Sequence, residues 1–271
     1  MDGEDIVRRN NVHLEGRGAR TVMLAHGFGC DQTMWRYLTP RLSAHFRLVL
    51  FDYVGSGGSQ MSAFDPQRYG TLEGYAKDIL DICRALELQD VILVGHSVSS
   101  IIGLLAAQSN PAFFSRLVLI CPSPCFLNIP PDYSGGFERE DLQELLDLME
   151  KNYLGWASFM APLVMGPEAP PDLVDELNRS FCATDVRAAR AFARATFLSD
   201  YRHILGDTRH PALILQSETD TLAQPNVGRY MHEHMPGSTF SLIQAEGHCL
   251  HMTHAAEVAE AIIGFCHERG G

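Results

Sequence analysis

The chain has 271 residues, of which 46% are hydrophobic and 20% charged, enough for one large domain with a substantial core. Its formal net charge of -12 provides no counterion release on nucleic acid and disfavours anionic membrane surfaces. The acidic N-terminus lacks a basic and apolar signal segment, and no apolar run approaches the ~18 residues that span a bilayer. We therefore expect a cytoplasmic protein without nucleic-acid or membrane partners, whose seven cysteines are reduced.

Strand and helix patterns alternate through the first half of the chain. Apolar runs bounded by turn residues predict strands at 6–7, 12–14, 21–25, 46–52, 91–94 and 115–121, the first two forming a hairpin. Helical spacing of apolar residues predicts helices at 31–42, 71–88 and from 101 onward. This alternation is typical of a mostly parallel sheet with right-handed crossovers.

The pattern changes after residue 122, where four prolines occur within ten positions. No strand is predicted between 138 and 205, and four helices are predicted at 138–154, 156–164, 171–181 and 185–198. Strands return at 212–216 and 240–243, with a helix after each. We predict an α/β fold with an eight-stranded, mostly parallel sheet, helices on both faces and an inserted four-helix lid. The core would comprise 1–124 and 206–271, and the lid 125–205.

The stretch Gly95 to Ser100 (GHSVSS) lies between a buried strand and a buried helix. A serine at the apex of a sharp strand-to-helix turn is typical of a nucleophile elbow, whose pattern is G-x-S-x-G. Ser97 is therefore the predicted nucleophile. Ser99 occupies the position of the second glycine, so we expect a more crowded turn in which the Ser99 hydroxyl bonds to nearby backbone.

A serine nucleophile needs a base, and the base needs an acid that orients it. Asp220 and His248 each follow a predicted strand, and the order Ser, acid, His is that of the α/β-hydrolases. Glu218 is a rival for the acid, two positions earlier. The backbone N–H groups of Phe28 and Val98 would receive the developing oxyanion.

Three other motifs are candidates for a metal, cofactor or redox site. His248, His251 and His254 are spaced by three, but no HExxH pattern accompanies them, so no metal is predicted. The Gly/Ser-rich loop at 52–59 lacks the ending of a phosphate-binding motif, and no cofactor is predicted. Cys30 and Cys249 flank predicted site residues, which leaves a redox role open beside the simpler role of small apolar side chains.

The chain resembles the RsbQ family of α/β-hydrolases, bacterial relatives of the plant strigolactone and karrikin receptors. The resemblance is carried by HGFGCDQTMW (26–35), FDYVGSGGS (51–59), GHSVS (95–99), CPSPCFLN (121–128), GGFE (135–138), MEKNYLGWA (149–157), VGRYMH (227–232) and GHCLHMTH (247–254). It implies a V-shaped lid over a deep apolar pocket. The implied pocket residues are Phe28, Val98, Phe126, Phe137, Trp156, Phe159, Phe197 and Leu222.

Two functions are compatible with these features. The first is a serine hydrolase (carboxylesterase or lactonase) that cleaves a small hydrophobic ester or lactone through an acyl-Ser97 intermediate, with perhydrolysis left open. The second is a ligand-binding regulator with slow or incidental hydrolysis. The resemblance implies for this second function a role in stress signalling together with a partner phosphatase.

Overall fold

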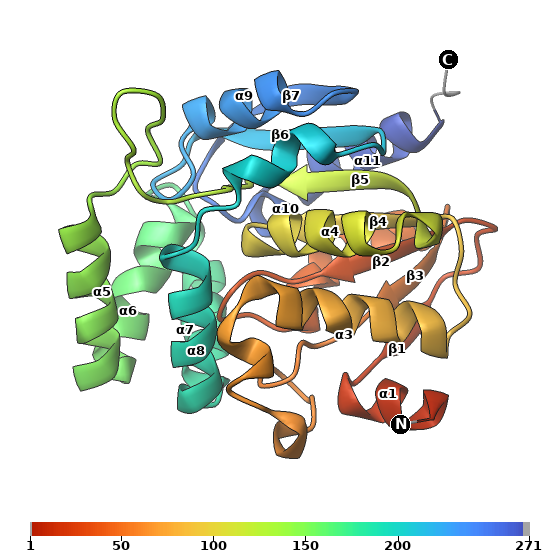
Figure 1. Ribbon diagram of the computed structural model, residues 1–271, viewed down its shortest axis with the longest axis horizontal. Helices are drawn as coiled ribbons and strands as arrows, with labels where there is room; N and C mark the ends of the chain where they lie inside the picture. Colours follow the sequence, from red (N-terminus) through yellow and green to blue (C-terminus); the bar gives the residue numbers. More distant parts are fainter. Residues whose placement is uncertain (1, 268–271) are drawn as a thin grey trace.

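A computed structural model describes residues 2–267 of the chain. Its centre is a seven-stranded sheet with the order β1-β3-β2-β4-β5-β6-β7 (Figure 1). β1 runs antiparallel to β3, and every other neighbouring pair is parallel. The strands are β1 (His13–Glu15), β2 (Thr21–Ala25), β3 (Arg47–Leu50), β4 (Val91–His96), β5 (Phe114–Ile120), β6 (Ala212–Thr219) and β7 (Ser238–Glu246).

The predicted eighth strand is wrong. Residues 6–7, expected to form the first arm of a hairpin, lie in the helix α1 (Gly3–Arg9). The side chains of Asp2 and Asp5 each accept the other's backbone N–H, which makes a capping box at the start of this helix. The described part of the chain therefore contributes seven strands to the sheet, and β1 alone precedes the parallel part.

Helices cover both faces of the sheet, as predicted for an α/β fold. One face carries α3 (Leu72–Ala85), α4 (Val98–Ser109) and α9 (Pro225–His234), and the other carries α2 (Thr39–Leu42), α10 (Leu250–Thr253) and α11 (Ala255–His267) (Figure 1). Because both faces are covered, the central strand β4 is buried along its whole length. The predicted helix at 31–42 is a short 3-10 helix at Gln32–Tyr37 followed by α2.

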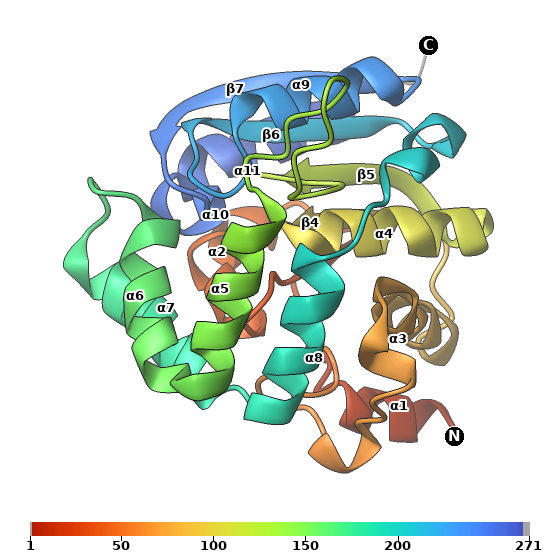
Figure 2. The same cartoon turned by 60° about the vertical axis from the view of Figure 1, so that its left-hand side comes forward.

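Four further helices lie beyond the carboxyl ends of the parallel strands (Figures 1 and 2). They are α5 (Arg139–Lys151), α6 (Tyr153–Met165), α7 (Pro171–Ala183) and α8 (Val186–Phe197), each within three residues of the predicted bounds. We call these four helices the lid. Most of their apolar residues join one core cluster with those of the sheet and of α11, whereas Phe192 and Ala195 of α8 join the cluster that includes α3 and α4.

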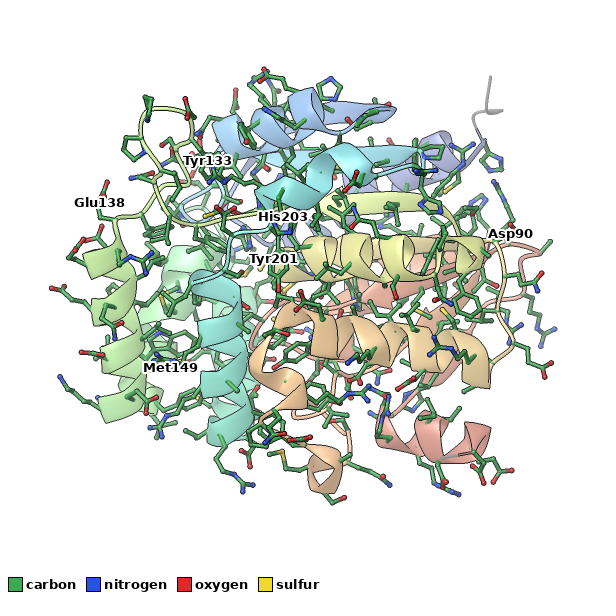
Figure 3. All side chains as sticks on the ribbon, in the orientation of Figure 1. Asp90, Tyr133, Glu138, Met149, Tyr201 and His203 are labelled. Atoms are coloured by element: carbon green, nitrogen blue, oxygen red, sulfur yellow. The ribbon has the colours of Figure 1, made fainter. Side chains whose placement is uncertain are left out.

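The chain enters and leaves the lid at one place. The backbones of Cys125 and Asp200 pair antiparallel, and the Tyr201 N–H donates to the Pro124 carbonyl at 2.8 Å. Figure 3 shows Tyr133 on the entering segment and Tyr201 on the leaving one. Positions 125 and 200 therefore lie side by side near the predicted limits of the lid, at 125 and 205.

Within residues 2–267 we find no helix with both the length and the apolar character that crossing a bilayer requires. The seven cysteines are free thiols, of which Cys182 alone is exposed.

Candidate active site

Ser97 stands at the turn between β4 and α4. Its backbone has φ 56° and ψ -125°, a conformation that non-glycine residues rarely adopt. Gly95 makes the turn sterically feasible, because a Cβ at this position would lie 2.4 Å from the Ser99 carbonyl oxygen. The Ser97 N–H donates to the Ile120 carbonyl at 2.8 Å, which anchors the turn to β5. The local geometry is that of the predicted nucleophile elbow.

The structure brings Ser97, His248 and Asp220 together. His248 Nε2 lies 2.7 Å from Ser97 Oγ, and His248 Nδ1 lies 2.8 Å from Asp220 Oδ2. Since a carboxylate only accepts, Nδ1 carries the proton, and Nε2 is free to accept the proton of the Ser97 hydroxyl. All three side chains are buried, whereas the rival acid Glu218 is exposed.

Asp220 is held as an anion. Burial raises the pKa of its carboxyl, but electrostatic attraction to the neighbouring His248 and hydrogen bonds from His248, Ala223 and Leu222 outweigh burial and keep that pKa below its usual range. The backbone N–H groups of Leu222 and Ala223 donate to Oδ1 at 2.8 and 3.0 Å. Oδ2 therefore remains for His248, and the carboxylate orients the imidazole.

The predicted oxyanion donors are the backbone N–H groups of Phe28 and Val98. Val98 is the first residue of α4, where an N–H has no carbonyl one turn earlier in the helix to bond. The Phe28 N–H shares its peptide unit with the Gly27 carbonyl, which lies 2.9 Å from His26 Nδ1 and accepts from the Cys30 N–H at 3.3 Å. Because the C=O and N–H bonds of a planar trans peptide point in opposite directions, these two contacts to the Gly27 carbonyl also fix the direction of the Phe28 N–H.

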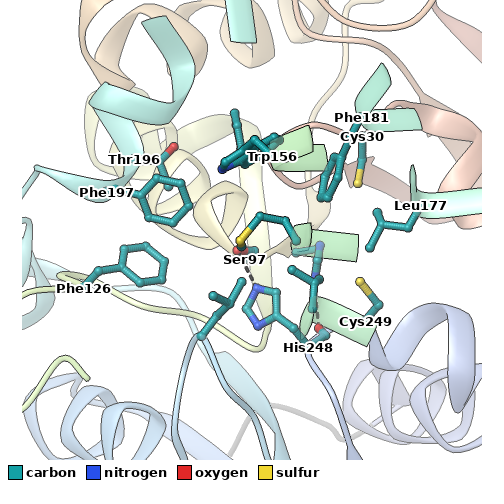
Figure 4. A pocket seen from close by; sticks show the side chains of 15 residues that line it. Cys30, Ser97, Phe126, Trp156, Leu177, Phe181, Thr196, Phe197, His248 and Cys249 are labelled. Atoms are coloured by element: carbon teal, nitrogen blue, oxygen red, sulfur yellow. Dashed lines mark hydrogen bonds between the residues drawn. The ribbon is translucent and has the colours of Figure 1, made fainter. Parts of the chain in front are cut away.

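A narrow pocket opens above Ser97 (Figure 4). Its volume is about 30 Å³, room for roughly two water molecules. The predicted residues Phe28, Phe126, Trp156, Phe197 and Leu222 line it. Apolar side chains make up most of the wall, so the pocket suits the apolar part of a small molecule.

A model of the alpha/beta hydrolase family matches residues 22–261. The chain belongs to the alpha/beta hydrolase family.

Individual relatives of this α/β-hydrolase cover nearly its whole length. A karrikin insensitive 2 receptor of Petunia hybrida is 40% identical over 88% of each chain. The strigolactone esterase of Arabidopsis thaliana is 36% identical over 96% of this chain and 97% of its own. The structure of a hydrolase from Oleispira antarctica has a TM-score of 0.97 and 54% identity, covering 99% of this chain and 98% of that one.

Three residues of the predicted pocket lie elsewhere in this α/β-hydrolase, beginning with Phe159 and Phe137. Phe159 is 57% exposed on the outer side of α6, and Phe137 lies behind Phe126 with the two ring centroids 6.5 Å apart. Met160 lines the pocket, and adjacent helical residues point about 100° apart, so Phe159 faces outward. The prediction of these two residues as pocket residues is therefore wrong. Val98 is buried and does not line the pocket either, so its prediction as a pocket residue is wrong as well.

Several pocket residues were not predicted. Met160 and Val164 follow Trp156 at intervals of four on α6, and Leu177 and Phe181 have the same interval on α7. This spacing was a usable signal, because residues four apart share one helix face. The remaining unpredicted lining residues are Cys30, His96, Thr196 and Cys249.

Cys121 lies beside the acid and the base. Its sulfur, a carboxylate oxygen of Asp220 and a ring nitrogen of His248 all lie within 4.8 Å of one another. These atom types could bind a soft divalent metal. A metal there would have to displace the hydrogen bond between Asp220 and His248, so the arrangement fits a Ser-His-Asp array better than a metal centre.

Ser99 connects the elbow to the loop that carries Phe28. Its hydroxyl donates to the His26 carbonyl, and the Tyr53 hydroxyl lies 3.0 Å from Ser99 Oγ. The expectation that Ser99 bonds to nearby backbone is confirmed. Because the bonded carbonyl belongs to the residue before Gly27, Ser99 helps to fix the loop that presents the Phe28 N–H.

Removing this hydroxyl tests the connection. We expect Ser99→Ala to lower the free energy of unfolding by about 1–3 kcal/mol, because it leaves a buried carbonyl unpartnered. The kcat should fall with little change in KM, by less than the ~10²–10³-fold cost of deleting an oxyanion donor. Urea unfolding and steady-state kinetics measure both effects. Tyr53→Phe is the control, since it keeps the bond to His26; equal behaviour of the two variants would contradict the assignment.

Two buried histidines lie behind His248. The ring centroids of His96 and His251 are 4.3 Å apart, and the His96 Nε2–H donates to the His248 carbonyl at 2.9 Å. Burial, followed by the proximity of His248, lowers the pKa of His96 to about 3. Burial and the proximity of His96 lower the pKa of His251 well below its usual value. Both rings are therefore neutral in the folded protein at neutral pH.

These histidines should make the protein sensitive to mild acid. The unfolded chain binds their protons below about pH 6.5 and the folded chain does not, so stability falls as the pH drops from there towards 3. Between roughly pH 7 and 5, each such histidine should cost about 2 kcal/mol. Urea unfolding at both pH values measures the loss. In His96→Gln the loss should shrink by about 2 kcal/mol; an unchanged loss would show that His96 is not held neutral.

Proposed function

We propose that this protein is a serine hydrolase that cleaves a small hydrophobic ester or lactone through an acyl-Ser97 intermediate. The observation that carries this proposal is the hydrogen-bonded chain from Ser97 through His248 to Asp220, at the base of an apolar pocket. Serine is a weak nucleophile unless a base takes its proton, and this arrangement supplies the base in the required tautomer.

The reaction would proceed in two halves. Ser97 Oγ attacks the carbonyl carbon while His248 Nε2 takes the hydroxyl proton, and the carbonyl oxygen becomes an oxyanion beside the N–H groups of Phe28 and Val98. The intermediate collapses, the C–O bond to the alcohol breaks, and His248 returns its proton to the leaving oxygen. Water then attacks the acyl-Ser97 ester with His248 again as base, and the acid product leaves.

The pocket supports the substrate class. Aromatic rings from the loop after β2 and from the lid meet above Ser97: the Phe28 centroid lies 5.8 Å from that of Trp156 and 5.7 Å from that of Phe197. A pocket wall made of aromatic side chains favours a substrate with an apolar acyl or lactone body over a charged substrate. The small volume favours a short substrate, or a lid that moves to admit a longer one.

A second candidate is a signalling receptor in which hydrolysis is slow or incidental. It is supported by the relative named as a karrikin insensitive 2 receptor. Resemblance of the lid motifs to RsbQ would extend it to a stress-response regulator that acts with a partner phosphatase. The same site serves both candidates, since a receptor could bind its ligand through the same pocket and serine.

Product stoichiometry separates the two candidates. Mixing the protein with p-nitrophenyl acetate and p-nitrophenyl hexanoate and following nitrophenol release from the first seconds gives both the burst and the steady rate. An enzyme releases many equivalents of product per protein at a constant rate. A receptor with incidental hydrolysis releases about one equivalent and then stalls. Absence of any release above the uncatalysed rate would contradict both hydrolytic candidates.

A further inference from the structure

We propose that Thr196 is a polar subsite in the pocket, which selects an ester or lactone whose apolar body carries a second oxygen atom. This inference rests on the proposed function and specifies its substrate class. The second oxygen could belong to an ether, a hydroxyl or a carbonyl group, since a threonine hydroxyl both donates and accepts hydrogen bonds.

Thr196 lies near the end of α8 and lines the pocket beside Phe197 (Figure 4). It is 3% exposed, and its hydroxyl oxygen has no hydrogen-bond partner. A buried hydroxyl without a partner is unfavourable relative to a methyl group of the same size. The position would therefore be better filled by valine unless something that enters the pocket bonds to the hydroxyl.

Two threonines at the ends of other helices, Thr184 just after α7 and Thr253 at the end of α10, behave differently. The Thr184 hydroxyl donates to the Ser180 carbonyl at 3.2 Å, and that of Thr253 donates to the Cys249 carbonyl at 3.3 Å. Both make the bond to the carbonyl four residues earlier that helical threonines usually make. Thr196 lies in α8 but makes no such bond, so its hydroxyl has no partner at the pocket wall.

The Ser97–His248 pair and His96, which also line the pocket, are occupied or shielded. Ser97 and His248 bond to each other. The unpartnered Nδ1 of His96 lies against Gly27, where an added Cβ would be only 2.6 Å away, so no ligand atom fits there. Among the lining residues that the structure describes, Thr196 is thus the hydroxyl that can anchor a ligand away from the reacting carbonyl.

Binding of matched esters tests the subsite without requiring turnover. The reference probe is p-nitrophenyl hexanoate, and the test probes are three analogues in which an ether oxygen replaces the third, fourth or fifth atom of the acyl chain. Calorimetric titration of Ser97→Ala is compared with Ser97→Ala carrying Thr196→Val or Thr196→Ser. The valine variant removes the hydroxyl at constant shape, and the serine variant retains it.

We expect at least one ether ester to lose about 3- to 10-fold in affinity relative to the hexanoate in the valine variant, and to keep most of it in the serine variant. Thr196→Val should leave the melting temperature of the ligand-free protein unchanged or raised, whereas loss of a hidden structural bond would lower it. Equal ether preference in all three proteins would overturn the subsite.

The outcomes also separate this inference from the proposed function. If the preference is present but the protein with Ser97 hydrolyses none of the esters, the proposed hydrolysis is wrong and the subsite stands. If the esters are hydrolysed with no dependence on Thr196, the subsite is wrong and the hydrolysis stands. If no ester binds to Ser97→Ala, the subsite is wrong, and hydrolysis by the protein with Ser97 alone decides the proposed function.

Discussion

Ser97→Ala should reduce kcat on a short-chain ester by about 10⁶-fold relative to the unsubstituted protein. The substitution removes the atom that attacks the carbonyl and leaves the pocket, the oxyanion donors and His248 in place. The variant can still hydrolyse the ester about 10³–10⁴-fold faster than the uncatalysed reaction in water, because the oxyanion donors still polarise the carbonyl. Steady-state release of nitrophenol measures the loss.

The control for this variant is Ser115→Ala, which removes a serine hydroxyl that bonds to the Asp90 carbonyl at the far end of β5. It should retain the full rate. The thermal unfolding temperatures of both variants should match that of the unsubstituted protein, which checks that both keep the fold. A Ser97→Ala variant with more than about a tenth of the original rate would mean that another group performs the reaction.

Asp220→Asn should reduce kcat by about 10⁴-fold while the protein stays folded. An asparagine carbonyl oxygen can still accept the N–H groups of Leu222 and Ala223, which leaves its NH₂ group facing His248 Nδ1. A donor at that position forces the imidazole proton onto Nε2, where it can no longer accept the proton of Ser97. The loss should appear in kcat, with little change in KM, since Asp220 touches no substrate.

Glu218→Gln is the matched control, because it makes the same chemical change at the rival acid two residues away. Glu218 is exposed, and we expect no effect on the rate. A larger loss for Glu218→Gln than for Asp220→Asn would reverse the assignment of the orienting acid.

Most of the architecture was predictable from the sequence because it rests on local patterns. The strand of apolar residues before Gly95 and the helix after Ser97 define the elbow without any tertiary information. Asp220 and His248 could be selected because carboxyl ends of parallel strands gather at one edge of a sheet. The first helix was missed, because the short apolar pair at 6–7 fits a strand and its capping by Asp2 and Asp5 depends on side-chain geometry.

The pocket was less predictable because it depends on how helices face one another. Phe159 and Met160 are neighbours in sequence, yet Met160 lines the pocket and Phe159 is exposed. The sequence pattern placed both residues on one predicted helix, at 156–164, but could not fix the rotation of that helix about its axis. The unpartnered hydroxyl of Thr196 was invisible in the sequence, since a threonine near a helix end usually bonds to its own helix.

The central claim is that Ser97 becomes covalently acylated, and intact-mass spectrometry tests it most directly. The protein is mixed with p-nitrophenyl hexanoate, quenched in acid within seconds and weighed, and peptide mapping locates the added group. The account predicts one hexanoyl group per chain, on the peptide that contains Ser97, and none in Ser97→Ala. An unmodified protein that nevertheless releases nitrophenol in many equivalents, or an acyl group on another residue that persists in Ser97→Ala, would contradict it.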